Sequence, residues 1–280
     1  MRISCIQMNM LPAEPDANFA RAEELVRKAA AEEKPDVIVL PETWNTGFAP
    51  GRIDPALADG DGARTQETFS ALGRELGVNI AAGSVASRRD GGLHNTAYVF
   101  DRAGNRIARY DKTHLFSPMG EDRAFVKGGS LCRFPLDGAR CALVICYDIR
   151  FPELVRTLAL PGLDVLFVVS QWPEQRIGQL ETLSRARAIE NQMFVSLCNS
   201  CGEAFGTRFG GRSAVIDPWG TALAEAGTGE TTITADADLS VLDDIRGSIP
   251  VFRDRRPDLY DLNFCPADGG ISRIDHYMED

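Results

Sequence analysis

The sequence predicts an α/β fold with a mixed β-sheet, and three observations carry this prediction. Short apolar segments alternate with amphipathic segments of helical period along most of the chain. Near the middle, two strand-like segments flank a turn at residues 101–105, as in an antiparallel hairpin. No low-complexity linker interrupts the pattern, so we expect a single domain over residues 1–265. A polar tail, residues 266–280, follows it and can lie at an oligomer interface.

The first half of the chain predicts a β–α–β unit followed by the hairpin. Residues 2–9 are apolar enough for a buried strand, and residues 18–32 place Ala, Leu and Val on one face of a helix. A further strand, helix and strand lead into the hairpin. The expected elements are strands at 2–9, 37–40, 79–84, 95–100 and 106–110, and helices at 18–32 and 63–76.

The second half repeats this alternation and then ends in an antiparallel region. We expect residues 213–216 and 231–235 to form that region around the turn Asp217-Pro218-Trp219-Gly220. The other expected elements are strands at 140–145, 165–169 and 194–197, and helices at 152–160 and 177–191. Periodicity alone indicates an α/β fold and does not fix the number of layers.

Composition excludes several classes of function. The 280 residues carry 30 basic and 40 acidic side chains, a formal charge of −10, and no basic block that would favour a nucleic-acid partner. No apolar run is long enough to cross a bilayer and no signal-peptide pattern is present, so we expect a cytoplasmic protein without a membrane partner. The seven cysteines are odd in number and lack framework spacing, which fits a reducing compartment.

The most informative segment surrounds Cys146. The apolar run that ends at Ile145 stops at this cysteine, and a polar turn and a helix-compatible stretch follow at once. Backbone N–H groups after such a turn point to where an oxyanion would form, and a helix N-terminus favours thiolate over thiol. Buried structural cysteines are common, so the turn alone leaves a catalytic role for Cys146 open.

Two other segments strengthen the catalytic interpretation. Glu42 ends the apolar strand segment Leu40-Pro41-Glu42, and Lys112 lies in the half-apolar stretch from Asp111 to Phe116. A glutamate can accept a thiol proton, and a lysine can stabilise a developing oxyanion. In this order and context, the motifs LPE, DKTHLF and CYDIRFPEL resemble those of the nitrilase superfamily of carbon–nitrogen hydrolases.

The resemblance continues beyond these three residues and implies both fold and mechanism. Within the superfamily, the segments WPEQR and RAIENQ look most like the omega-amidase branch, which hydrolyses the side-chain amide of 2-oxo acids. It implies a four-layer α-β-β-α sandwich, at least a homodimer, and a cysteine thioester intermediate. It assigns Glu42 as general base, Lys112 and the backbone N–H of Tyr147 as oxyanion donors, and Glu121 as a second glutamate beside the lysine.

Substrate contacts are expected from residues that follow the strand at 165–169. An indole from Trp172 can close the pocket wall, and the guanidinium of Arg176 can hold a substrate carboxylate bidentately. An acidic protein needs such a local cation to bind an anionic substrate, and Lys112 is a second candidate for this role. The alternatives are that Trp172 is part of the core and that Arg176 caps or pairs at the surface. Arg150 follows Cys146 closely and could bind substrate, but for this residue a structural ion pair that holds the turn is expected instead.

Other mechanisms and activities remain open at this stage. A Cys–His mechanism of papain type would need one of the histidines His94, His114 and His276, and we expect His114 to lie near the site only as an indirect neighbour, on the same strand face as Lys112. Cys198 and Cys201 have the spacing of a redox pair or half a metal site, but no second pair completes four ligands. We therefore expect neither metal nor cofactor.

The leading hypothesis is a hydrolase that cleaves a small omega-amide, such as 2-oxoglutaramate, to carboxylate and ammonia. Nitrilase, carbamoylase, other aliphatic amidase and acyl-transferase activities share the thioester chemistry and stay open. A binding module of the same fold that has lost catalysis is the alternative from another class. Such a module has no physical need for Glu42, Lys112 and Cys146 together.

Overall fold

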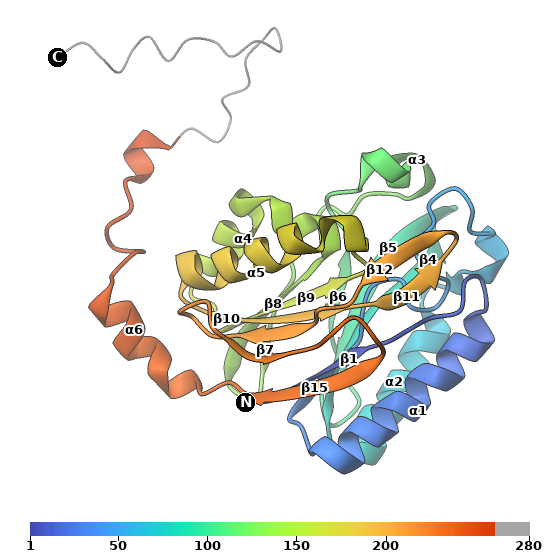
Figure 1. Ribbon diagram of the computed structural model, residues 1–280, viewed down its shortest axis with the longest axis horizontal. Coiled ribbons are helices and arrows are strands. Elements are labelled where there is room, and N and C mark those ends of the chain that lie inside the picture. Colours follow the sequence, from blue (N-terminus) through green and yellow to red (C-terminus); the bar gives the residue numbers. More distant parts are fainter. Residues whose placement is uncertain (261–280) are drawn as a thin grey trace, which may run out of the picture.

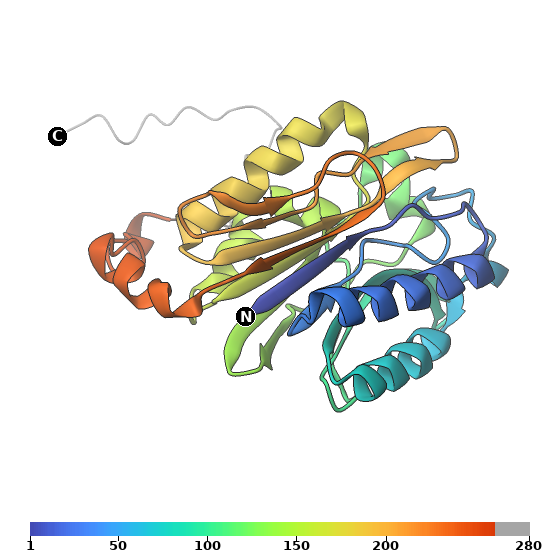
Figure 2. The ribbon, with the colours of Figure 1, turned by 60° about the horizontal axis from the view of Figure 1, so that its bottom comes forward.

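Two β-sheets lie face to face in the computed structural model, which describes residues 1–260 (Figure 1). Helices α1 (Pro15–Glu33) and α2 (Ala63–Leu76) cover the outer face of the first sheet. Helices α4 (Pro152–Ala159) and α5 (Ile177–Asn191) cover the outer face of the second, as the turned view also shows (Figure 2). The expected four-layer α-β-β-α sandwich is therefore confirmed.

The first sheet brings the N-terminal strands together with the last strand. Its order is β15-β1-β2-β4-β5-β6, with β3 added beside β4. Strands β1, β2 and β4 are parallel, whereas β4, β5 and β6 form antiparallel hairpins. The strands are β1 (Arg2–Gln7), β2 (Val37–Val39), β3 (Asp59–Gly60), β4 (Asn79–Arg89), β5 (Gly92–Phe100), β6 (Arg106–Asp111) and β15 (Thr231–Asp236).

The second sheet has the order β14-β13-β10-β9-β8-β7, and its central strands β8, β9 and β10 are parallel. A separate hairpin is formed by β11 and β12. The strands are β7 (Arg133–Leu136), β8 (Ala139–Ile145), β9 (Val165–Ser170), β10 (Phe194–Asn199), β11 (Cys201–Ala204), β12 (Thr207–Gly210), β13 (Ala214–Ile216) and β14 (Ala222–Glu225). Parallel strands in each sheet place several strand ends along a common edge.

Short helical segments complete the described chain. Two are α-helical, α3 (Glu121–Ala124) and α6 (Leu242–Ser248). The 3₁₀ turns are η1 (Pro55–Leu57), η2 (Ser117–Met119), η3 (Cys146–Arg150), η4 (Glu174–Arg176), η5 (Leu239–Val241) and η6 (Pro257–Leu259). Turns η2, η3 and η4 each follow a strand or loop at the edge where the candidate site lies.

The main apolar core fills the space between the two sheets. Val39 from the first sheet and Val144 and Phe167 from the second belong to one fully buried cluster. A second cluster, which includes Phe19 and Phe69, lies between the first sheet and helices α1 and α2. Because burial of apolar surface stabilises by roughly 25 cal/mol per Å², these two layers hold the strand ends in fixed relative positions.

One predicted pairing is wrong. Residues 213–216 and 231–235 do not pair with each other, because β13 pairs with β10 and β14 in the second sheet, whereas β15 pairs with β1 in the first. The turn at Asp217 instead joins β13 to β14, which is a short, half-exposed strand that the apolar pattern did not predict. Strands β3, β7, β11 and β12 were also missed. All are short, so their pattern is weak.

The remaining domain predictions concern the ends of the chain. The extent of the domain over residues 1–265 stays a prediction, and the predicted tail at 266–280 lies outside the described residues. Within residues 1–260, no helix combines the length and the apolar character that a membrane crossing requires.

Candidate active site

Glu42, Lys112 and Cys146 converge at one end of the sandwich from three different strands. Glu42 follows β2, Lys112 follows β6, and Cys146 follows β8 of the opposite sheet. The two sheets are joined here, since the Glu42 backbone N–H donates to the Ser170 carbonyl at 3.3 Å. Glu42 Oε2 accepts from the Gln171 backbone N–H at 2.9 Å. The sequence predicted these strand ends, and the packing of the sheets brings them together.

Lys112 is the centre of a fully buried ionic cluster. Its Nζ lies 2.8 Å from Glu42 Oε1, and 3.0 and 2.8 Å from the two carboxylate oxygens of Glu121. All three side chains are 0% exposed. Burial opposes the charge on Lys112, but Glu121 and Glu42 outweigh it and raise its pKa well above the usual value.

Glu121 lies where the resemblance implied, at the start of α3 and in direct contact with Lys112. Its Oε2 also accepts from the Phe116 backbone N–H at 2.6 Å, so the carboxylate holds the loop after Lys112. Burial raises the pKa of Glu121, Lys112 partly offsets this effect, and Glu42 adds to it. The pair of carboxylates is therefore held by one ammonium group.

Asn95 is a member of this cluster that the sequence analysis missed. It lies on β5, is 1% exposed, and donates from Nδ2 to Glu42 Oε1 at 2.8 Å and to Glu121 Oε1 at 3.1 Å. Its own carbonyl accepts from the Lys112 backbone N–H at 2.9 Å. An asparagine inside a predicted strand carries a weak signal, because strand periodicity does not tell which polar face meets a site.

The turn at Cys146 is sharp and is held by a buried carboxylate. Cys146 has φ of +48°, a left-handed conformation that non-glycine residues rarely adopt. Asp148, which is 0% exposed, accepts from the Ile145 backbone N–H at 3.0 Å and from the Tyr110 hydroxyl at 2.8 Å. It also accepts from the His114 backbone N–H at 3.0 Å. Asp148 therefore fastens the turn to the loop that carries Lys112.

The electrostatic expectation for the thiol is reversed by the structure. Burial and, after it, the Glu42 carboxylate raise the pKa of Cys146, and Lys112 only partly opposes them. The segment directly after Cys146 is a single 3₁₀ turn and not the helix N-terminus that the sequence analysis assumed there. Its dipole is smaller than that of a helix, so it stabilises a thiolate less. The resting group is therefore a thiol, which needs a base to become a nucleophile.

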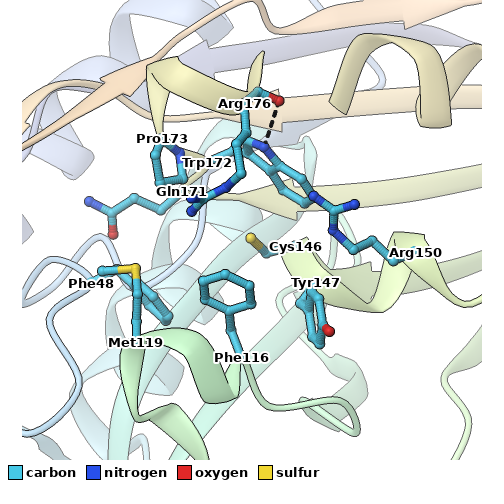
Figure 3. A pocket seen from close by; sticks show the side chains of 10 residues that line it. All are labelled: Phe48, Phe116, Met119, Cys146, Tyr147, Arg150, Gln171, Trp172, Pro173 and Arg176. Atoms are coloured by element: carbon cyan, nitrogen blue, oxygen red, sulfur yellow. Dashed lines mark hydrogen bonds between the residues drawn. The ribbon is translucent and has the colours of Figure 1, made fainter. Parts of the chain in front are cut away.

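Cys146 opens into a narrow pocket (Figure 3). Its Sγ points into the space between Trp172 and Phe116. The indole of Trp172 is 3% exposed and donates from Nε1 to the Arg176 carbonyl at 2.9 Å, so Trp172 forms a fixed wall. The remaining lining comes from Phe48, Met119, Tyr147, Arg150, Gln171, Pro173 and Arg176.

Two guanidinium groups line this pocket. Arg176 lies over the Phe116 ring with its Cζ 5.4 Å from the ring centroid, and Arg150 lies over Trp172 at 4.8 Å. Neither side chain forms a salt bridge with any residue in the described range 1–260. The ion pair expected for Arg150 is therefore not found. Both side chains line the cavity beside the thiol, and Arg150 also donates to the side-chain oxygen of Gln179.

The alternative chemistries have less support in the described part of the chain. His114 is not a strand neighbour of Lys112, because β6 ends at Asp111; its ring lies 2.9 Å from Asp148 and stacks on Phe151. His94 turns toward Asp111, and neither ring lines the pocket. His276 lies outside the described residues. No group of three or more possible metal ligands occurs among residues 1–260.

The comparisons with known proteins agree with one another. The family profile described as carbon-nitrogen hydrolase matches residues 2–247. The chain is 42% identical to a 2-oxoglutaramate amidase of Bacillus subtilis (strain 168), over 92% of this chain and 98% of that protein. It is 32% identical to an omega-amidase of Danio rerio, over 94% of this chain and 97% of that one.

One solved structure adds chemical information. An amidase variant from Nesterenkonia sp. AN1, with glutamine in place of a glutamate, carries the acetamide moiety of fluoroacetamide on its active-site cysteine. It shares 25% identity with this chain and a TM-score of 0.80, and the match covers 92% of this chain and 95% of that one.

Proposed function

Because this chain belongs to the carbon-nitrogen hydrolase family and is similar to a 2-oxoglutaramate amidase and to omega-amidases within it, we propose that it hydrolyses a small omega-amide. The substrate is the monoamide of a 2-oxo dicarboxylic acid, such as 2-oxoglutaramate, and the products are the dicarboxylate and ammonia. The similarity to a 2-oxoglutaramate amidase along nearly the whole chain carries this proposal.

The proposed reaction uses Cys146 as nucleophile and Glu42 as base. Glu42 takes the thiol proton while the sulfur attacks the amide carbon, which forms a C–S bond and an oxyanion. Collapse of this intermediate breaks the C–N bond, and Glu42 returns the proton to the leaving ammonia. Glu42 then takes a proton from water, which attacks the thioester; the C–S bond breaks, and the sulfur leaves as the thiol with the proton that Glu42 returns to it.

Lys112 and the backbone N–H of Tyr147 are the proposed oxyanion donors. The three N–H bonds of Lys112 are directed to Glu42 and Glu121 in the resting site. An oxyanion therefore has to displace one carboxylate contact of Lys112, which links the role of Glu121 to that of the lysine. The raised pKa of Lys112 supports a charged ammonium throughout.

The proposed carboxylate subsite is formed by Arg176, with Arg150 as a second cation on the other side of Trp172. Both guanidinium groups are half-buried and stacked on aromatic rings, so little further ordering is needed to bind an anion. A substrate without the carboxylate would leave these charges unpaired in the pocket and should be disfavoured.

The function is tested by hydrolysis of three amides. We expect 2-oxoglutaramate and succinamate to be hydrolysed faster than butyramide, and the preference to fall in Arg176→Ala. Equal rates on charged and neutral amides would contradict the substrate assignment. A preference that survives in Arg176→Ala but disappears in Arg150→Ala would assign the carboxylate to Arg150.

The covalent step is tested separately. Rapid quench and intact mass measurement should detect an acyl adduct on Cys146, and Cys146→Ala should lose turnover while it remains folded. Cys201→Ala is the matched control, because Cys201 is also buried but does not line the pocket. Full turnover in Cys146→Ala would overturn the thioester mechanism.

A further inference from the structure

Asn95 contacts every charged member of the ionic cluster, yet it carries no charge. Its side-chain amide donates to Glu42 Oε1 at 2.8 Å and to Glu121 Oε1 at 3.1 Å. Its main-chain carbonyl accepts from the Lys112 N–H. Both hydrogens of the amide nitrogen are therefore committed to carboxylates, and the residue links β5 to the strand ends that carry the base and the lysine.

The oxygen of this amide, Oδ1, lies in an unfavourable environment. Asn95 Oδ1 is buried and has no hydrogen-bond partner within the described residues. An unsatisfied buried acceptor is unfavourable by about 1–3 kcal/mol. The reversed amide would place this oxygen against two carboxylate oxygens, which is worse. The two N–H bonds to the carboxylates therefore determine the orientation of the side chain.

The cluster needs neutral donors because its charges do not balance. Two buried carboxylates, Glu42 and Glu121, share the single ammonium of Lys112. Their repulsion favours uptake of a proton by the pair, whereas a hydrogen bond to an ionised carboxylate opposes it. The amide of Asn95 supplies one such bond to each carboxylate without adding charge.

We infer that Asn95 is a positioning residue of the reaction, which orients the carboxylates of Glu42 and Glu121 side by side through one hydrogen bond to each, so that Glu42 can accept the proton of Cys146. The inference rests on the proposed function for the identity of the base. It does not depend on which amide is hydrolysed.

The titratable groups that face the carboxylate pair are few. Lys112 approaches from the end of β6 and Cys146 from the end of β8. His94, the neighbour of Asn95 on β5, is directed to Asp111 instead. On α3, Asp122 and Arg123 are exposed. A change at Asn95 should therefore act on one coupled unit made of Glu42, Glu121, Lys112 and Cys146.

The test uses the pH dependence of Cys146 alkylation by iodoacetamide, followed by mass spectrometry. In the proposed reactive state, Glu42 and Cys146 hold one proton between them. If either carboxylate of the cluster takes up a further proton, we expect alkylation of Cys146 to stop. Asn95→Leu keeps the volume of the side chain but has no hydrogen-bond donor. In this variant we expect the acidic limb of the pH profile of the alkylation rate to move up by about one pH unit or more, because a charge-assisted hydrogen bond to the carboxylates is lost. The acidic limb of kcat/KM should move with it.

Two further variants make the result specific. Asn95→Asp replaces the donor by a third carboxylate and should shift the limb at least as far; if it does not fold, Asn95→Leu carries the test. Asn18→Leu is the matched control, since Asn18 is equally buried and its amide binds only the main chain of Leu11 and Asn45. It should lose stability with an unshifted limb.

The outcomes separate this inference from the proposed function. An unshifted limb in folded Asn95→Leu, with only stability reduced, would overturn the positioning role. Absence of omega-amide hydrolysis in the native protein, together with a shifted alkylation limb in Asn95→Leu, would remove the proposed substrate and leave the inference intact.

Discussion

Glu42 and Glu121 contact the same ammonium group but face different neighbours, and this difference separates their chemistry. Glu42 has one oxygen on Lys112 and Asn95, and the other on the Gln171 backbone N–H beside the thiol. Glu121 shares Oε1 between Lys112 and Asn95 and Oε2 between Lys112 and the Phe116 N–H, whereas Glu42 is close enough to the Cys146 thiol to raise its pKa. Of the two carboxylates, Glu42 is therefore the one suited to exchange a proton with Cys146.

The first prediction compares variants of the base and the lysine. Glu42→Gln keeps the shape of the side chain and can still bind Asn95, so it should fold normally but lose about a hundredfold or more in kcat. Lys112→Met should lose activity and also stability, by about 3–5 kcal/mol, because it leaves two buried carboxylates without a cation. Steady-state kinetics and urea unfolding of both variants measure the two effects.

The expected loss of stability in Lys112→Met follows from the structure and could not be expected from the sequence. From sequence, both residues are expected to affect turnover far more than folding. The full burial of Lys112 between two carboxylates changes that expectation for the lysine alone. Near-native turnover in either variant would mean that the residue has no part in catalysis, and an unchanged unfolding midpoint in Lys112→Met would contradict the ionic cluster.

At the scale of elements, one buried carboxylate contributes to the attachment of α6 to the second sheet, beside hydrogen bonds from the Arg246 and Gln192 side chains to main-chain carbonyls. Asp164, in the loop before β9, accepts two bonds from the Arg140 side chain of β8, at 2.9 and 2.6 Å. Arg246 of α6 reaches the same carboxylate at 3.2 Å. Burial raises the pKa of Asp164, but the Arg140 side chain and backbone N–H outweigh it and lower the pKa to about 2.

The second prediction follows from this lowered pKa. A carboxyl group whose pKa is depressed in the folded state stabilises the protein above its unfolded pKa, and this contribution is lost as the pH falls toward the folded value. Asp164→Asn should therefore lower the free energy of unfolding by about 1–2 kcal/mol at neutral pH. This value takes into account that solvent screens the charge of the exposed Arg140 side chain. The difference from the native protein should shrink between pH 4 and pH 2.

Urea unfolding at several pH values checks this prediction. Asp238→Asn serves as the comparison, because Asp238 is exposed and binds only the adjacent Ser240. It should leave stability almost unchanged at neutral pH. A cost at Asp164→Asn that stays constant down to pH 2 would show that packing, and not the ionised carboxylate, holds α6.

The elements that sequence predicted well are those with a strong apolar period and a clear end. Helix α2 has the bounds that its pattern predicts, Ala63–Leu76, and the hairpin of β5 and β6 turns at Asp101, whose carboxylate accepts from the Ala103 and Asn105 N–H groups. β13 and β15 were assigned to one antiparallel region. Periodicity shows that a strand is half-buried but does not say which sheet it joins.

Some residues of the candidate site could also be predicted from the sequence, and others could not. Glu42, Lys112 and Cys146 could be predicted because each ends a recognisable segment and together they form an ordered motif. Asn95 could not, because its role depends on contacts across strands. Asn95 is identified only when the structure shows β5 paired with β6 and the Asn95 amide in contact with Glu42, which follows β2 on the other side of β4. For Arg150 the sequence suggested either a substrate contact or an ion pair, and its position over Trp172 in the pocket lining favours the first.

At the scale of the whole molecule, the position of the site depends on the contact between the two sheets. Cys198 of β10 lies in this contact and donates from Sγ to the carbonyls of Ile6 and Val39 in the opposite sheet, each at 3.2 Å. Cys5 of β1 approaches Ser196 of β10 from the other side, at 3.2 Å. The sulfur atoms of Cys5 and Cys198 become accessible only if the two sheets separate, whereas Cys146 lines the pocket.

The last prediction uses this difference between buried cysteines. Burial raises the pKa of Cys146 and of Cys198, but of these two cysteines only Cys146 lines the pocket. Iodoacetamide should therefore modify Cys146 in the folded protein and Cys198 only when the sheets separate. Because the two sheets share one core, that opening should be global. In urea, Cys198 labelling measured by peptide mass spectrometry should rise with the loss of far-ultraviolet circular dichroism. Labelling of Cys198 well below that transition would instead mean that the halves of the sandwich part locally, so that the strand ends carrying Glu42 and Cys146 can separate without unfolding.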